Sequence, residues 1–234
     1  MYRIQYQFLF DKQNINKLTI VIDPKTFSMV PPDLENKPAW TRLEYRQCDC
    51  CPLTKEEQPY CRIAINIALI IETFKNRISY EKCVVRCITP ERIYQKNTSL
   101  MEGLSSLLGL IMATSDCPAM SLFKPMARFH LPFSTIEETM VRATSMFLLR
   151  QYFIHKDNLV PNLKLEELRE SYETVKVLNA ALLKRIKGLA SQDSDKNAIM
   201  IFHSISEILS MEIEANLSSI EHIFTISDDR VLRG

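Results

Sequence analysis

Apolar and polar residues alternate with a period of two at the start of the chain. The apolar positions in this alternation are Tyr2, Ile4, Tyr6, Phe8 and Phe10. Residues 11–14 carry turn-forming side chains, and apolar residues at 18, 20 and 22 then share one face of a return strand. The pattern predicts a β-hairpin over the first 23 residues. Four prolines make residues 24–39 a connection, and Trp40 to Arg46 is expected to form a third short strand.

The apolar spacing becomes helical after this strand. One helical face carries Ile63, Ile67, Ile70, Ile71 and Phe74, which predicts a helix from about Cys61 to Phe74. The stretch from Tyr80 to Ile88 is typical of another strand. Thr89, Pro90 and Glu91 turn the chain, and Arg92 to Lys96 is expected to return as its partner.

Beyond residue 97 the chain is predicted to be almost wholly helical. Ser99 and Glu102 have the spacing of a capping box, in which the serine accepts from a helix amide and the glutamate reaches back. The run from Gly103 to Met112 is apolar nearly all round, which indicates a buried central helix whose small residues let neighbours approach closely. Ser134 and Glu137 form a second capping box, expected to open a helix that ends near His155.

Two long apolar stripes follow at helical spacing. The first contains Leu165, Leu168, Tyr172, Val175, Leu178, Leu182, Ile186 and Leu189. The second contains Ala198, Ile201, Ile205, Ile208, Leu209, Ile213, Leu217, Ile220 and Phe224. Residues 188–195 separate them, so the two helices are expected to pair as an antiparallel hairpin. A homo-oligomer, if one forms, is expected to use these C-terminal helices.

Together the elements predict an α+β fold, with a small, mostly antiparallel N-terminal sheet packed on a C-terminal helical bundle. Residues 1–97 form the mixed sheet and helix region that carries a cysteine loop, and residues 98–234 form the helical region. We expect both to belong to one continuous structural domain, because 234 residues can bury one large core.

Net charge and hydropathy argue against two classes of function, nucleic-acid binding and membrane binding. The chain has 29 basic and 28 acidic residues, a net charge of +1, so no global field attracts nucleic acid or an anionic membrane. No apolar run approaches the roughly 18 residues that span a bilayer, and the N-terminus lacks the basic and apolar pattern of a secretory signal. We therefore expect a cytoplasmic protein that binds neither nucleic acid nor membrane. Its partner is expected to be a protein or a small ligand.

Seven cysteines supply the sharpest chemical signal, because four of them fall within fourteen residues. Such clustering favours metal or thiol chemistry over a disulfide framework. Cys48 and Cys51 form a C-x-x-C pair, and Cys61 precedes a predicted helix. Zn²⁺ takes four ligands in a tetrahedron. Cys117, in a turn before Pro118, is the first choice for the fourth ligand. His130 and Cys50 are the alternates.

Other interpretations of these thiols stay open. The same cysteines could hold an iron–sulfur cluster, or Cys48 and Cys51 could form a redox pair, which is disfavoured because Pro52 and a polar loop follow. They could also be incidental free thiols. Cys83 and Cys87 lie four apart in a predicted strand with Val85 between them, so both are expected to pack in the core.

The segment from Pro125 to Phe133 is apolar but carries Arg128 and His130, and Glu137 and Glu138 follow it. These groups could bind an anion or perform acid–base chemistry. A buried structural connection between helices is favoured, because no nucleophile or second histidine lies nearby. In that interpretation His130 bonds a backbone carbonyl, and Arg128 pairs with a glutamate.

Two hypotheses of function follow. The favoured one is a non-enzymatic, zinc-stabilised binding or scaffold module with Cys48, Cys51, Cys61 and Cys117 as ligands. The alternative is a redox or metal-dependent enzyme with an iron–sulfur centre or an open zinc site near His130. The sequence has only four glycines, none grouped, so no phosphate-binding loop supports an enzyme of that class.

Four motifs together resemble a family of uncharacterised bacterial proteins. They are the CxxCPL motif that starts at Cys48 with Cys61 after it, the GLSSLLG motif that starts at Gly103, the pair Cys117-Pro118, and the PMARFHLPF motif that starts at Pro125. The resemblance covers most of the chain. It implies an intracellular bacterial protein and singles out Cys48, Cys51, Cys61 and Cys117, with Cys50 as an extra. It assigns no activity and no catalytic residue.

Overall fold

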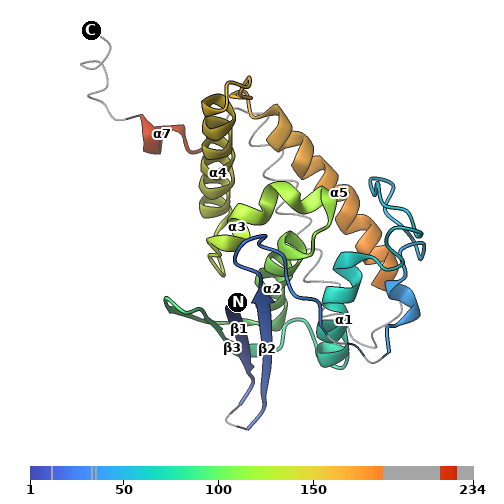
Figure 1. The fold of residues 1–234 in the computed structure, drawn as a ribbon. Helices are drawn as coiled ribbons and strands as arrows, with labels where there is room; N and C mark the ends of the chain where they lie inside the picture. Colours follow the sequence, from blue (N-terminus) through green and yellow to red (C-terminus); the bar gives the residue numbers. More distant parts are fainter. Residues whose placement is uncertain (12, 33, 35, 187–216, 226–234) are drawn as a thin grey trace.

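The structure is a computed structural model that describes residues 1–11, 13–32, 34, 36–186 and 217–225. Its strands are β1 (Tyr2–Leu9), β2 (Ile15–Ile22), β3 (Lys82–Ile88) and β4 (Ile93–Ser99). Its α-helices are α1 (Arg62–Phe74), α2 (Leu100–Thr114), α3 (Lys124–Arg128), α4 (Ile136–Lys156), α5 (Glu166–Ile186) and α7 (Glu221–Phe224), and its 3-10 helices are η1 (Ala39–Thr41) and η2 (Pro118–Phe123). The strands precede most of the helices, and the fold is α+β, as the sequence predicts (Figure 1).

The four strands form one antiparallel sheet in the order β2-β1-β3-β4. Alternation along β1 buries Ile4, Tyr6 and Phe8 on one face, so the predicted hairpin is confirmed. Tyr6 faces Leu18 on one side and Cys87 on the other. The interpretation of Cys83 and Cys87 as core residues is also confirmed, because both are buried on this face with Val85 between them.

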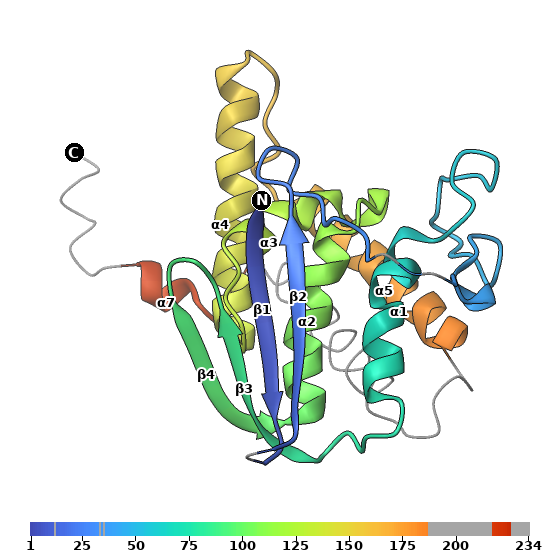
Figure 2. The same ribbon diagram turned by 60° about the horizontal axis from the view of Figure 1, so that its bottom comes forward.

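Helices α1 and α2 cover the buried face of the sheet (Figure 2). The ring of Phe74 on α1 meets Phe8 edge to face, with 4.9 Å between ring centroids. Gly103 lets α2 approach, because a Cβ there would lie 2.8 Å from both Phe8 Cε1 and Val85 Cγ2. Ser99 and Glu102 complete the capping box predicted for α2. One cluster of buried side chains runs from the strands through α5 to Ile220.

Three local predictions are wrong. Residues 40–46 form no strand: η1 is followed by a turn, and Arg42 makes only an isolated bridge with Tyr60. Part of the predicted connection after Pro125 is helical, since α3 extends to Arg128. The second capping box is shifted by one residue, because Thr135 and Glu138 form it in place of Ser134 and Glu137.

The apolar stripe on α5 is confirmed as a buried face. The second stripe and the predicted hairpin loop at 188–195 lie mostly outside the described residues, and α7 is the part of that stretch seen as a helix. Among the described residues, no single helix combines the length and apolar character that crossing a membrane requires. Only α2 taken together with Pro118–Arg128 reaches them, with a bend of 114° between the two.

We expect Gly103→Ala to lower the free energy of unfolding by about 1–3 kcal/mol, because its Cβ has no room against Phe8 and Val85. Gly109→Ala is the matched control in the same helix, since Gly109 borders a cavity. Relief of glycine entropy should make this control more stable by about 0.5–1 kcal/mol. Denaturant unfolding followed by circular dichroism measures both. Equal stability of the two variants would contradict the close packing of α2 on the sheet.

Candidate metal centre and ligand cavity

Five of the seven cysteines line one small cavity of about 30 Å³. The five are Cys48, Cys50, Cys51, Cys61 and Cys117, and they come from three separate segments. The cavity lies where the loop before α1, the N-terminal end of α1, η2 and the C-terminal half of α5 meet, which Figures 1 and 2 show as neighbouring segments. All four cysteines predicted as ligands therefore lie around one cavity, together with the alternate Cys50.

The backbone of each segment is arranged locally to present its thiol. The amide of Cys51 donates to the carbonyl of Cys48 at 3.0 Å, which closes the C-x-x-C turn. Cys61 is the N-cap of α1, and its amide donates to Thr41 at 2.8 Å. Cys117 is the N-cap of η2, where Pro118 fixes the chain beyond it. Both N-cap cysteines have extended backbone, as the sequence predicts for Cys117.

Burial keeps two of these thiols protonated. Desolvation, with smaller contributions from neighbouring cysteines, raises the pKa of Cys48 to about 12. The same causes raise the pKa of Cys117 to about 12, and Cys61 is a neighbour of both thiols. In the conformation described, however, no three Cys, His, Asp or Glu side chains of the described residues converge on one point as metal ligands would. The thiols line the cavity, but their sulfur atoms are not arranged around one point as the ligands of a metal ion are.

Arg185 lines the same cavity and is the largest fully buried side chain, at 2% exposure. Its guanidinium donates to four backbone carbonyls of the loop before the cysteines, those of Trp40 at 2.8 Å, Arg42 at 2.6 Å, Leu43 at 3.1 Å and Arg46 at 3.4 Å. No carboxylate of the described residues pairs with it. A buried positive charge held only by neutral carbonyls is the strongest electrostatic feature beside the thiols.

Arg62 is the second cation at the cavity wall. One end of its guanidinium lies 3.8 Å from Asp116, and Asp116 also pairs with Lys124 at 2.5 Å. The Nε atom of Arg62 is buried and has no partner among the described residues. Two arginines therefore line the same cavity as the five thiols. Sequence inspection missed both, although Arg185 follows Leu178 and Leu182 on the buried stripe of α5.

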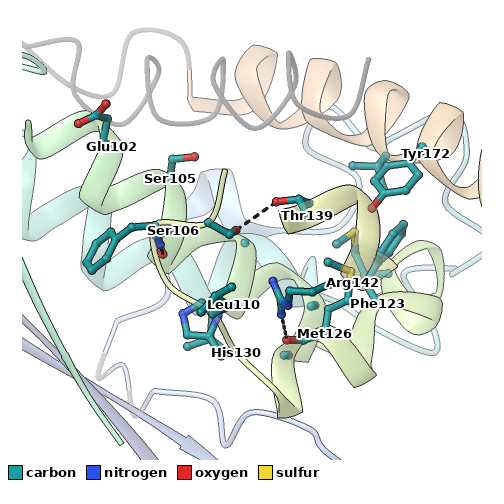
Figure 3. A pocket seen from close by; sticks show the side chains of 18 of the residues that line it. Glu102, Ser105, Ser106, Leu110, Phe123, Met126, His130, Thr139, Arg142 and Tyr172 are labelled. Carbon is teal, nitrogen blue, oxygen red and sulfur yellow. Dashed lines mark hydrogen bonds between the residues drawn. The ribbon is translucent and has the colours of Figure 1, made fainter. Parts of the chain in front are cut away.

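His130 lies elsewhere, in the wall of a separate cavity of about 260 Å³ that no cysteine of the described residues lines (Figure 3). Its Nε2 atom is 2.6 Å from the hydroxyl of Tyr6, and that hydroxyl is 2.9 Å from Ser106 Oγ. Desolvation, with the charge of Arg142 as a smaller cause, lowers the pKa of His130 to about 3. His130 is therefore a neutral side chain bonded to Tyr6, where sequence inspection expected a backbone carbonyl.

The other charged groups of this segment also differ from expectation. Among the described residues, no glutamate forms an ion pair with Arg128, which lies over the rings of Tyr2, Phe27 and Phe129, 4.8–5.7 Å from their centroids. Glu138 is used by the capping box of α4. Arg142 and Lys96 bring positive charge to the cavity that His130 lines. The position of Arg142 in the first third of α4 gives no sign of this role in the sequence.

The fold and the two cavities define an α+β protein with a cysteine-lined centre and a separate cavity suited to a small molecule. The model of the domain of unknown function DUF6901 matches residues 4–225, so the chain belongs to that family. The family match agrees with the uncharacterised family inferred from the sequence motifs. No curated protein and no solved structure matches the chain.

Replacing Arg185 with methionine should lower the free energy of unfolding by about 3 kcal/mol, because buried carbonyls of residues 40–46 lose their donor. The neighbouring side chain of Lys184 is exposed, so Lys184→Met should change stability by less than about 0.5 kcal/mol. Urea unfolding of the two variants tests the expectation. A cost for Arg185→Met no larger than that of Lys184→Met would show that the guanidinium does not hold the loop.

Acid should destabilise the protein through His130. Its folded pKa, about 3, lies below the unfolded value of about 6.5. The unfolded chain therefore binds the extra proton, and stability is lost as the pH falls from 6.5 towards 3, by about 1 kcal/mol per pH unit. His130→Gln keeps an acceptor for Tyr6, so its unfolding free energy should fall less between pH 6.5 and 4.5. The exposed His155→Gln should keep the wild-type slope, and an unchanged slope in His130→Gln would contradict the assignment.

Proposed function

We propose that the chain is a metal-stabilised binding module, in which one zinc ion held by the thiolates of Cys48, Cys51, Cys61 and Cys117 joins the cysteine loop to α1 and η2. The observation that supports this most is the gathering of thiols from three distant segments around one cavity. Incidental thiols have no reason to collect there. A metal would require their side chains to rotate onto one centre and lose their protons.

Charge balance supports a thiolate centre. Four thiolates around Zn²⁺ leave two net negative charges, and Arg62 and Arg185 bring two positive charges to the wall of the same cavity. The unpartnered Nε of Arg62 is the kind of donor that stabilises a metal-bound thiolate. The two arginines would therefore offset the charge of a four-thiolate zinc centre, in addition to the contacts that Arg185 makes with the loop carbonyls and Arg62 with Asp116.

The choice of four ligands among five thiols follows from the backbone. The hydrogen-bonded turn from Cys48 to Cys51 presents two thiolates to one ion. Cys61 neighbours both Cys48 and Cys117. Cys50 lies between the turn residues next to Cys51, so it is proposed as an accessory thiol.

The alternative centres have less support. A cavity of about 30 Å³ accommodates a single ion and is small for a four-iron cluster. An open zinc site near His130 lacks thiol ligands among the described residues, and Tyr6 already occupies the Nε2 atom. Reduced, metal-binding thiols fit a cytoplasmic location, which we propose on that ground.

Protein purified under reducing conditions without chelator should contain about one zinc per chain, measured by elemental analysis. Cys61→Ser should lose most of the metal, because it removes one of the four proposed thiolate ligands, the one at the N-cap of α1. Cys83→Ser is the matched control, because Cys83 lies in the sheet core and outside the cavity. A strong chelator should lower the melting temperature of wild type and leave that of Cys61→Ser unchanged.

Cys50→Ser separates ligand from accessory thiol, since it should retain zinc. Metal-free wild-type protein, with a melting temperature indifferent to both chelator and Cys61→Ser, would overturn the proposed function. A brown protein with visible absorption after anaerobic purification would replace zinc with an iron–sulfur cluster.

A further inference from the structure

The larger cavity is a partly open space lined by residues of α2, the η2–α3 segment, α4 and α5 (Figure 3). Its volume of about 260 Å³ suits a small organic molecule. Most of its wall is hydrocarbon, supplied by residues that include Leu110, Ala113, Met120, Phe123, Ala127 and Val175. A ligand for this space must therefore bring an apolar body.

Arg142 brings a positive charge into this apolar space. One guanidinium nitrogen donates to the carbonyls of Met126 at 3.0 Å and Phe129 at 2.9 Å, which fixes the side chain. The remaining donors of the fork are not used by the described residues, and no carboxylate there forms an ion pair with Arg142. A fixed, partly desolvated guanidinium without an anion is a receptor for a planar oxyanion.

His130 is oriented as a second donor by a chain of hydrogen bonds. Ser106 Oγ accepts from the amide of Phe133 at 3.2 Å and shares a hydrogen bond of 2.9 Å with the hydroxyl of Tyr6, in which either oxygen can be the donor. The same hydroxyl lies 2.6 Å from Nε2 of His130. In the tautomer in which Tyr6 donates to Nε2, the neutral ring carries its proton on Nδ1, and this N–H has no partner among the described residues.

Tyr172 is a third donor. Its ring packs edge to face on Phe123, with 5.0 Å between centroids, and burial raises its pKa, so the hydroxyl keeps its proton. The hydroxyl has no hydrogen-bond partner among the described residues. Figure 3 shows Arg142 reaching in from α4 between Tyr172 and His130. The three side chains with unused hydrogen-bond donors, Arg142, His130 and Tyr172, come from three different segments and line one cavity.

We propose that this cavity binds a small monocarboxylate with an unbranched apolar body, its carboxylate bonded to Arg142 and Tyr172 and its chain among the apolar side chains. Glu102 also lines the cavity and its lowered pKa keeps it ionised, but Lys96 brings the opposite charge to the same cavity, so the pair supplies no second binding site for an anion. The site is separate from the cysteine centre and rests on different residues.

Octanoate and 1-octanol are matched probes of this proposal, since they share the chain and differ in charge. Calorimetric titration of zinc-containing protein should give octanoate at least about tenfold tighter binding than 1-octanol. Octanedioate should bind at least about tenfold more weakly than octanoate, because its second carboxylate would enter the apolar part of the cavity.

Tyr172→Phe should weaken octanoate binding by about five- to tenfold and leave 1-octanol unaffected, because only the carboxylate uses the hydroxyl. The exposed Tyr152→Phe is the matched control and should bind as wild type does. Circular dichroism and zinc content check that each variant folds and retains metal.

Absence of octanoate binding to folded protein would overturn the proposal, as would equal affinity for octanoate and 1-octanol or indifference to Tyr172→Phe. If the protein is purified without zinc but binds octanoate, the proposed function is contradicted and the ligand site is supported. If the protein contains zinc but binds no octanoate, the ligand site is contradicted and the proposed function is supported.

Discussion

The guanidinium of Arg185 holds the end of α5 against the loop that leads to the cysteines. It donates to four carbonyls of residues 40–46, a segment that forms a 3-10 helix and turns where a strand was expected. A buried cation is costly unless its surroundings supply polar groups. Here the carbonyls supply part of that compensation, and thiolates at the adjacent cavity would supply the rest. The loop, α1 and α5 therefore depend on one charged group.

Different residues of η2 and α5 line the two cavities. On η2, Cys117 and Ala119 face the cysteine cavity, whereas Met120 and Phe123 face the larger one. On α5, Arg185 lies at the first and Tyr172 at the second. A metal that fixed η2 would also fix Phe123, the ring on which Tyr172 packs. The metal would thereby hold the Tyr172 hydroxyl in position for a ligand in the larger cavity. A structural metal ion would in this way affect ligand binding.

Sequence periodicity predicted the strands and helices that bury one face and expose the other. Alternation in β1 and the stripe of α5 are local signatures of a single buried face, and both are confirmed. Local sequence patterns did not predict the correct cap where two capping-box motifs overlap. Ser134 and Thr135 both begin a capping-box motif, and in the structure Thr135 is the residue whose side chain accepts from the amide of Glu138. The Cys-Pro context singles out Cys117 in the sequence, but its place at the same cavity as Cys61 depends on the packing of α2. The roles of Arg142 and Arg185 could not be predicted from the sequence, because their guanidinium groups donate to carbonyls of other segments of the chain.

The central claim is that the gathered thiols bind one metal ion through sulfur alone. X-ray absorption at the zinc edge of the protein as purified measures this directly. The account predicts four sulfur neighbours at about 2.3 Å and no lighter ligand. Nitrogen or oxygen neighbours at about 2.0–2.1 Å, or protein without zinc, would contradict it.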